Sequence, residues 1–221
     1  MEPAREVGGD LYDCFFIDER LLCIVVGDVS EKGAPAAMFM ARATSLVRMA
    51  VGLRAELAPD EPRSPASIAA TVNRALCQNN DERMFVSLFL GFLDTATGAM
   101  AYVNAGHPLP IIVRASGELV ELKSAPDVPL GIKQDAQYHD SHMNLGAADM
   151  LFVYSDGVPE AMNPAGEFFG FERLAASLNG RQNVLPDDLV AAVKVEMDRF
   201  AGSAPKADDV TMLALRWSPA G

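Results

Sequence analysis

Five aspartates stand beside apolar runs, where an isolated charge is costly unless something uses it. They are Asp10, Asp28, Asp156, Asp208 and Asp209. A single aspartate next to a glycine or at a strand end commonly caps a turn, and that explanation requires no chemistry. Acids at the ends of neighbouring strands, however, can converge on one rim of a sheet. The five together are therefore candidates for one shared site.

Carboxylates that converge in this way repel one another and raise each other's pKa. A divalent cation relieves the repulsion. Oxygen ligands with no Cys or His among them suit Mg²⁺ or Mn²⁺ better than Zn²⁺. Glycines beside these acids let the backbone come close, so the main-chain carbonyl of Val29 is a further candidate ligand. The pattern predicts a site for two such ions.

The runs that must position these acids indicate strands and helices in separate groups. Predicted strands cover 11–17, 20–26, 84–94, 99–104, 110–115, 118–122, 138–145, 150–155 and 210–217. Predicted helices cover 35–51, 65–78, 171–179 and 187–201, and a predicted loop covers 52–64. Pro35 suits the first turn of its helix, and Ser64 is a good N-cap. Hairpin-linked strands with helices grouped between them favour an α+β fold of antiparallel sheets covered by helices.

The composition excludes several classes of protein. A chain of 221 residues is long enough for a single domain with its own core. It contains no run of about 18 consecutive apolar residues, so no membrane span is expected. The net charge of −12 argues against nucleic acid as the main partner. The three cysteines form no Cys-x-x-Cys pair, and with only three histidines a zinc or redox centre is not expected.

Six motifs follow one another along nearly the whole chain. They read VGGDLYD, GDVSEKGAPAAMFMA, NAGHPLP, PLGI, YSDGVPEA and DDVTMLALR. In this order they resemble the SpoIIE/RsbU-like branch of the metal-dependent (PPM) serine/threonine protein phosphatases. The resemblance implies a four-layer α-β-β-α sandwich, in which two antiparallel sheets are flanked by helices. It also implies one such domain over residues 1–221, as the C-terminal catalytic part of a longer regulated protein.

The resemblance assigns roles to the acids. Asp28 would bridge two Mn²⁺ or Mg²⁺ ions, with Asp10 and the Val29 carbonyl completing the ligands of one. Asp156 and Asp208 would hold the other. Two ions ~3.5–4 Å apart activate a water for in-line attack on phosphorus, here that of phosphoserine or phosphothreonine. Asp28 and Asp156 would be catalytic through that water.

Other residues of the motifs carry weaker expectations. Asp209 is the alternative to Asp208, since either acid of the pair could face the ion. His107 is expected to pack or to bond the backbone in a tight loop rather than to act in catalysis. Lys32 is expected as a solvated turn residue, with phosphate binding as the alternative. The family's turn commonly reads Ser-Gly-Lys-Gly, and here Glu31 replaces the first glycine.

Partners and location follow from the resemblance alone. Such domains lie in the bacterial cytoplasm, attached to sensor domains. They dephosphorylate a phosphoserine on a STAS-type anti-sigma-factor antagonist. An upstream sensor domain would here act through the helices at 35–51 and 65–78. Assembly as a homodimer is left open.

Two rival interpretations come from other classes. Gly8-Gly9-Asp10 is similar to the start of a nucleotide-cyclase signature, but Leu11-Tyr12 follows where that signature has Glu-Phe. The second rival is a catalytically weak or inactive phosphatase-fold domain that acts as a regulatory binding module. Since all the predicted metal acids are present, an active enzyme is favoured over it.

Overall fold

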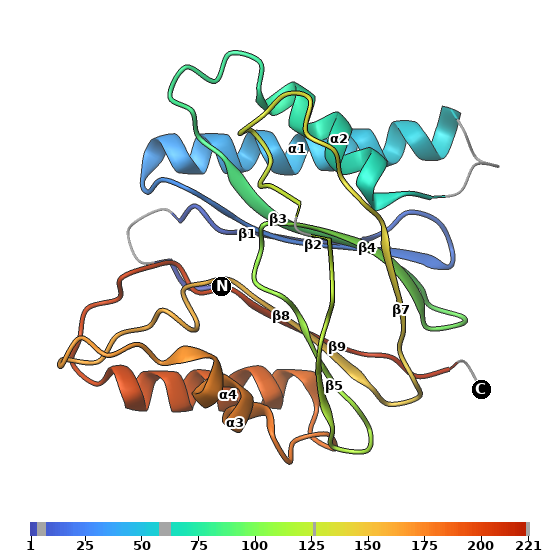
Figure 1. The fold of residues 1–221 in the computed structure, drawn as a ribbon. Helices are drawn as coiled ribbons and strands as arrows, with labels where there is room; N and C mark the ends of the chain where they lie inside the picture. The colour runs from blue at the N-terminus through green and yellow to red at the C-terminus, as the bar shows by residue number, and fades with distance from the viewer. Residues whose placement is uncertain (4–7, 58–62, 126, 220–221) are drawn as a thin grey trace.

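The computed structural model describes residues 1–3, 8–57, 63–125 and 127–219. These residues form two antiparallel sheets that lie face to face, with two helices over the outer face of each sheet (Figure 1). The layers therefore run helix, sheet, sheet, helix. The predicted α+β sandwich is confirmed.

The first sheet has the strand order β1–β2–β3–β4–β7, and each neighbouring pair is antiparallel. Its strands are β1 (Leu11–Phe16), β2 (Leu21–Val29), β3 (Val86–Asp94), β4 (Ala99–Ala105) and β7 (Ser141–Asn144). The second sheet has the order β6–β5–β8–β9. Its strands are β5 (Ile111–Val113), β6 (Leu119–Glu121), β8 (Met150–Tyr154) and β9 (Met212–Arg216). Three of these pairings, β1 with β2, β3 with β4 and β5 with β6, are hairpins, as the short turns between apolar runs predict.

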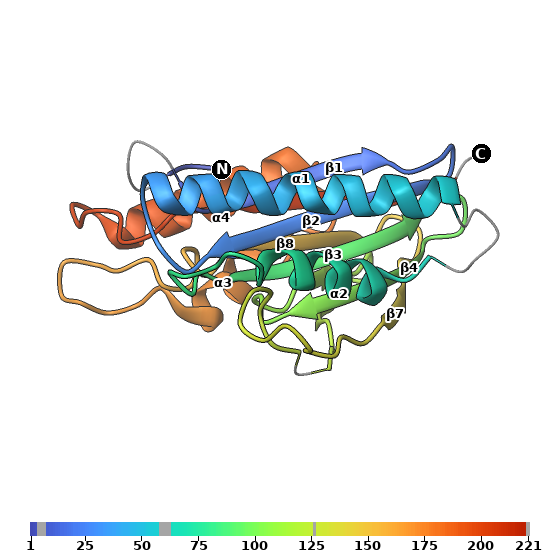
Figure 2. The ribbon, with the colours of Figure 1, turned by 90° about the horizontal axis from the view of Figure 1, so that it is seen from above.

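The helices divide between the two outer faces. Above the first sheet lie α1 (Ala34–Leu57), along β1 and β2, and α2 (Pro65–Leu76), along β3 and β4 (Figure 2). Below the second sheet lie α3 (Gly170–Leu178) and α4 (Pro186–Ala201) (Figure 1). Ser64 caps α2, because its hydroxyl accepts a hydrogen bond from the Ser67 N–H at 3.1 Å.

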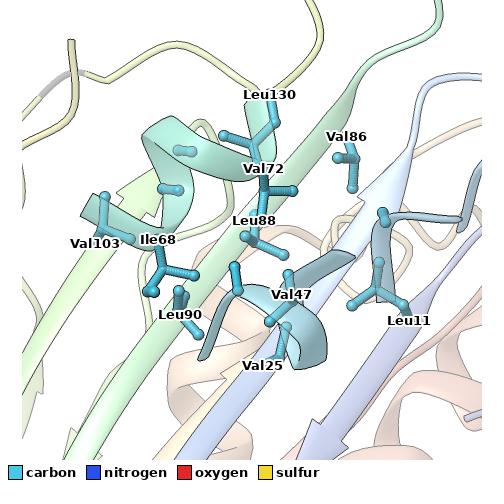
Figure 3. Close-up of a cluster of buried hydrophobic side chains, with 14 of the residues drawn as sticks. Leu11, Val25, Val47, Ile68, Val72, Val86, Leu88, Leu90, Val103 and Leu130 are labelled. Carbon is cyan, nitrogen blue, oxygen red and sulfur yellow. The ribbon is translucent and has the colours of Figure 1, made fainter. Parts of the chain in front are cut away.

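Alternation along the strands divides the core into three layers. Val25 packs under α1 and α2, in the cluster that Figure 3 shows. Its neighbour Ile24 points the other way, into the layer between the sheets. In β8, Leu151 faces that middle layer while Phe152 faces α3 and α4. Each fully buried side chain of this kind contributes roughly 1.5–3 kcal/mol of transfer free energy, so both sheets are held on both faces.

The structure differs from the predicted elements mainly at helix α1. The predicted loop began at residue 52, but α1 continues to Leu57. Gly52 is exposed inside the helix and a β-carbon there would meet nothing within 4 Å, so it does not break the helix. Part of the predicted loop, 58–62, lies outside the described residues. By length and composition α1 would also suit a membrane span, yet its buried side chains pack in the first core layer.

Candidate active site

Asp10 and Asp28 meet at one end of the first sheet. Asp28 is next to last in β2, and Asp10 immediately precedes β1. The antiparallel register pairs Leu11 with Gly27, so the next position along the ladder places Asp10 opposite Asp28. Asp10 is almost fully buried, whereas Asp28 is half-buried at the rim.

Asp156 and Asp208 come from the second sheet. Strand β8 ends at Tyr154, which pairs with Met212 at the start of β9. Asp156 follows the first of these strand ends and Asp208 precedes the second, so the two acids leave the sheet on the same side. Both side chains are half-buried. Each sheet thus contributes two acids.

The four acids lie close enough to change each other's ionisation. Burial, with the nearby charges of Asp156 and Asp10, raises the pKa of Asp28 to about 9. Burial, with the charges of Glu160 and Asp208, raises the pKa of Asp156 to about 6. Burial also raises the pKa of Asp10. The predicted convergence of acids from distant parts of the chain is therefore present, and Glu160 is an additional acid that the sequence did not single out.

Ser155 fixes the orientation of Asp10. Its hydroxyl donates to Asp10 Oδ2 at 2.9 Å and accepts from the Thr211 N–H at 2.9 Å. The other oxygen of Asp10, Oδ1, is buried without a hydrogen-bond partner in the described structure, and so is Asp156 Oδ1. Buried carboxylate oxygens are rarely left unpaired. Sequence reasoning missed Ser155, whose only signal is its position directly before Asp156.

Lys32 is exposed in the turn before α1, as predicted, and its ammonium group also contacts an acid of the site. Its Nζ is 2.8 Å from Asp208 Oδ2 and also donates to the Ala207 carbonyl oxygen. Gly33 has a φ of 85°, which turns the chain into α1 directly after this lysine. The ammonium group therefore balances the charge of one of the four acids.

The two acids of the Asp208–Asp209 pair have different surroundings. Asp209 is buried, and its Oδ2 accepts a hydrogen bond from the Gly9 N–H at 2.5 Å. A β-carbon at Gly8 would lie 2.8 Å from the same oxygen, so a larger residue here would force the Asp209 side chain to shift. The charge of Asp208, in contrast, acts on both Asp28 and Asp156. The charge of Asp209 also acts on Asp10, so both acids of the pair border the site and the choice of Asp208 stays a prediction.

The Val29 carbonyl and His107 lie at the back of the site. A β-carbon at Gly9 would lie 3.4 Å from the Val29 carbonyl oxygen, so the glycine leaves that side of the carbonyl uncovered. His107 is buried, which lowers its pKa to about 3 and keeps its ring neutral. Its Nδ1 shares a hydrogen bond of 3.0 Å with Ser87 Oγ, and Ser87 pairs with Asp28 across β2 and β3. His107 thus packs behind Asp28.

The donor atoms suit a hard cation, although they are not assembled as a complete ligand set. Across residues 1–3, 8–57, 63–125 and 127–219, no three Asp, Glu, His or Cys side chains are arranged to hold a metal ion as they stand. The unpaired oxygens of Asp10 and Asp156 and the crowding of like charges are what Mg²⁺ or Mn²⁺ would relieve.

The family model described as Stage II sporulation protein E (SpoIIE) matches residues 18–218. The chain belongs to the SpoIIE family. The resemblance to the SpoIIE/RsbU-like branch of the metal-dependent phosphatases is thereby confirmed. The match covers three of the four converging acids, and Asp10 precedes it.

Two curated relatives are longer than this SpoIIE-family chain. Protein IcfG of Synechocystis sp. is 30% identical over 233 residues, which cover 97% of this chain and 36% of IcfG. Phosphoserine phosphatase RsbU of Bacillus subtilis is 29% identical over 164 residues, which cover 74% of this chain and 46% of RsbU. The chain therefore corresponds to less than half the length of either relative.

Solved structures share the fold of this SpoIIE-family chain. The SiaA-PP2C domain of Pseudomonas aeruginosa aligns with a TM-score of 0.82 at 24% identity, covering 98% of this chain and 84% of that one. RsbX in complex with magnesium aligns with a TM-score of 0.68 at 16% identity, covering 99% of this chain and 92% of RsbX. At these identities the likeness establishes the PP2C-type fold.

Proposed function

We propose that this SpoIIE-family domain is a metal-dependent protein phosphatase that hydrolyses phosphoserine or phosphothreonine. The observation that carries the proposal is the meeting of four carboxylates from two sheets, with the pKa of Asp28 raised to about 9. Acids of like charge held together against their repulsion are typical of functional sites. RsbU, named a phosphoserine phosphatase, supports the reaction class.

The residues that would hold two Mg²⁺ or Mn²⁺ ions follow from the geometry and the family. Asp28 would contact both ions. Asp10 and the Val29 carbonyl would complete the protein ligands of one ion, and Asp156 and Asp208 those of the other. When bound, such ions supply an acidified water and positive charge opposite the phosphate. The magnesium of the RsbX structure supports this class of ion.

The chain's own groups prepare the site for that chemistry. Ser155 fixes one oxygen of Asp10 and leaves the other directed at no protein donor. The apolar layer between the sheets excludes water from behind the acids, so a phosphate ester would approach from the rim. Lys32 balances the charge of Asp208 and keeps a positive group beside the path of an incoming phosphate.

The proposed substrate is a phosphoserine on a STAS-type anti-sigma-factor antagonist in the bacterial cytoplasm, with an upstream sensor domain as the regulatory partner. The greater length of IcfG and RsbU supports the presence of further domains in such proteins. Input would reach the site through α1, since α1 begins five residues after Val29, at the end of the β2 strand that carries Asp28.

The test is hydrolysis of p-nitrophenyl phosphate and of a phosphoserine peptide, with Mn²⁺ and with EDTA. The wild-type chain should hydrolyse both only with the metal. Asp28→Asn should lower kcat by at least ~10³-fold, because removing a group that stabilises the transition state costs about 10²–10³ in rate or more. Asp135→Asn, at an exposed position remote from the site, is the control and should keep full activity. An Asp28→Asn protein that is folded and fully active would refute the proposal.

A second function, an inactive domain that only binds a partner, is favoured by one observation. The acids are not assembled as metal ligands in the described residues, and Lys32 is bound to Asp208. The same assay separates the two functions, because an inactive binding domain would leave both substrates intact at millimolar Mn²⁺.

A further inference from the structure

A groove of about 660 Å³ lies beside the candidate active site, between the start of α1 and the segment that follows α2. Its apolar lining includes Pro35, Met38 and Phe39 from α1 and Met84 from the segment before β3. Met38 is 75% exposed, an unusual position for a large apolar side chain at the start of a helix. Methionine adapts to differently shaped partners, so it suits a docking surface.

The groove is tied to the strands that carry the site. The Ser30 N–H donates to the Phe85 carbonyl oxygen at 3.0 Å, and the Phe85 N–H donates to Ser30 Oγ at 3.2 Å. Met84 is three residues before Ser87, the partner of Asp28, which corresponds to roughly 10 Å along an extended chain. Met84 packs on the helix-covered face of the sheet, and Val26, two residues before Asp28, on the opposite face, so a peptide bound at the site would pass around the end of the sheet to reach the groove.

The edge of the groove is acidic. Asp81 and Glu82 line it, both are exposed, and neither forms an ion pair within residues 1–3, 8–57, 63–125 and 127–219. Arg42 also lines the groove, but its guanidinium donates to the carbonyl oxygens of Ala75 and Gln78 at the end of α2. Arg42 keeps its positive charge, and two acids against one arginine leave the lining with a net negative charge.

We propose that this groove binds the residues next to the phosphoserine of a protein substrate, taking an apolar side chain flanked by Lys or Arg. The apolar side chain would lie on Met38, Phe39 and Met84, and the cationic group would face Asp81 and Glu82. This inference rests on the proposed phosphatase function and names the substrate feature that the site selects. In a chain of net charge −12, a basic flank also offsets the repulsion that a phosphopeptide meets on approach.

The experiment uses the 221-residue chain and matched phosphoserine peptides. Each peptide carries Leu three residues from the phosphoserine, on either side, with Arg or Asp next to the Leu. The wild-type chain should show a higher kcat/KM for an Arg peptide than for its Asp counterpart, by about tenfold, as expected for two exposed charge pairs. p-Nitrophenyl phosphate reports the chemistry without the groove.

Two variants separate charge from apolar contact. The double variant Asp81→Lys with Glu82→Lys should invert the preference between the Arg and Asp peptides. Met38→Gln should lower kcat/KM for the Leu peptides about threefold or more, and should leave peptides with Ser in place of Leu unchanged. Glu172→Lys, an exposed acid on α3 in the opposite layer, is the matched control and should change neither preference. Every variant should hydrolyse p-nitrophenyl phosphate as the wild type does.

The outcomes distinguish the two proposals. If the wild type fails to hydrolyse p-nitrophenyl phosphate with Mn²⁺, the phosphatase function fails, and the groove inference with it. If that ester is hydrolysed but the charge-reversed variant keeps the wild-type peptide preference, the groove inference alone is overturned. An effect of the variants only when upstream sequence is attached would instead assign the groove to a regulatory segment, and would likewise overturn it.

Discussion

The positive charge of Lys32 affects the ability of the candidate site to bind a cation. Its ammonium group lies 2.8 Å from Asp208 Oδ2, and both side chains are partly exposed. An ion pair with this exposure contributes at most about 1 kcal/mol to stability. Its larger effect is on cation binding, because a divalent ion that takes Asp208 as a ligand would bind near the positive charge of Lys32.

Replacing Lys32 with Met should therefore strengthen cation binding. We expect the dissociation constant for Mn²⁺ to fall about three- to tenfold, as the loss of a nearby like charge predicts. Titration of free Mn²⁺ by electron paramagnetic resonance measures this directly, without any substrate. Lys133→Met is the control, since the Lys133 ammonium group pairs with the exposed Asp135 on a loop. If Lys32→Met binds Mn²⁺ with the same or lower affinity than the wild type, the charge of Lys32 does not oppose cation binding.

At the scale of elements, the close approach of the chain after β8 to the chain before β9 depends on a glycine. A β-carbon at Gly157 would lie 1.9 Å from the Asp209 carbonyl oxygen, far inside contact distance. The turn after β8 and the approach to β9 can be this close only without a side chain. Asp156 and Asp208 sit on the two sides of this contact, so it also sets their separation.

Gly157→Ala should destabilise the domain by about 2–4 kcal/mol, because backbone must move to relieve the overlap. For a chain of this size that corresponds to a fall in Tm of roughly 4–16 °C, at about 2–4 °C per kcal/mol. Differential scanning calorimetry of the metal-free protein measures it. Gly52→Ala, where a β-carbon meets nothing within 4 Å, is the matched control and should stabilise helix α1 slightly. If the two variants have equal Tm values, the segments beside β8 and β9 can move apart without loss of stability, and the close contact at Gly157 is not required.

Elements with a clear periodicity could be predicted from the sequence, and their ends could not. Strands β1 to β4 follow apolar runs bounded by turn residues, so their positions were evident. Helix α1 was predicted to stop before Gly52, because glycine lowers helix propensity, but packing of Val47 and Val51 in the core carries the helix to Leu57. Tertiary burial outweighed the local signal there.

The acids of the site could also be predicted from the sequence. The residues that contact them, Ser155 and Lys32, could not. An aspartate beside an apolar run stands out in a sequence, as Asp28 and Asp156 do. Ser155 and Lys32 have residue types that are common in any turn. Their roles come from contacts across more than a hundred residues, with Asp10 and Asp208 respectively. Pairings of this kind are set only by the three-dimensional fold.

At the scale of the whole molecule, the acids link two sheets that otherwise meet through an apolar layer. Asp28 belongs to the first sheet and Asp156 to the second, and burial and mutual repulsion raise both pKa values. A raised pKa means that the folded state holds a proton that the unfolded state has released. Stability should therefore fall as the pH rises from the ordinary value near 4 toward the folded pKa, which for Asp28 is about 9.

The predicted fall in stability with rising pH can be tested between pH 7 and 8.5. His107, with its pKa lowered to about 3, and Asp156 contribute little change in that range, so the coupled pair of Asp28 and Asp10 dominates. At about 1.4 kcal/mol per pH unit, the metal-free chain should lose roughly 2 kcal/mol over this range, or about 4–8 °C in Tm. Asp28→Asn should flatten the dependence, and the Asp28→Asn protein should be the more stable one at pH 8.5.

Mn²⁺ should reverse the trend, because a cation favours ionised carboxylates and stabilises only the folded state that binds it. The rise in Tm at 1 mM Mn²⁺ should accordingly be larger at pH 8.5 than at pH 7, and it should vanish in Asp28→Asn. Thermal unfolding at both pH values, with Mn²⁺ or EDTA, gives the four measurements required. A metal-free Tm that rises with pH would mean that the acids of the two sheets are not forced together in the folded chain, and the shared site would then lose its physical basis.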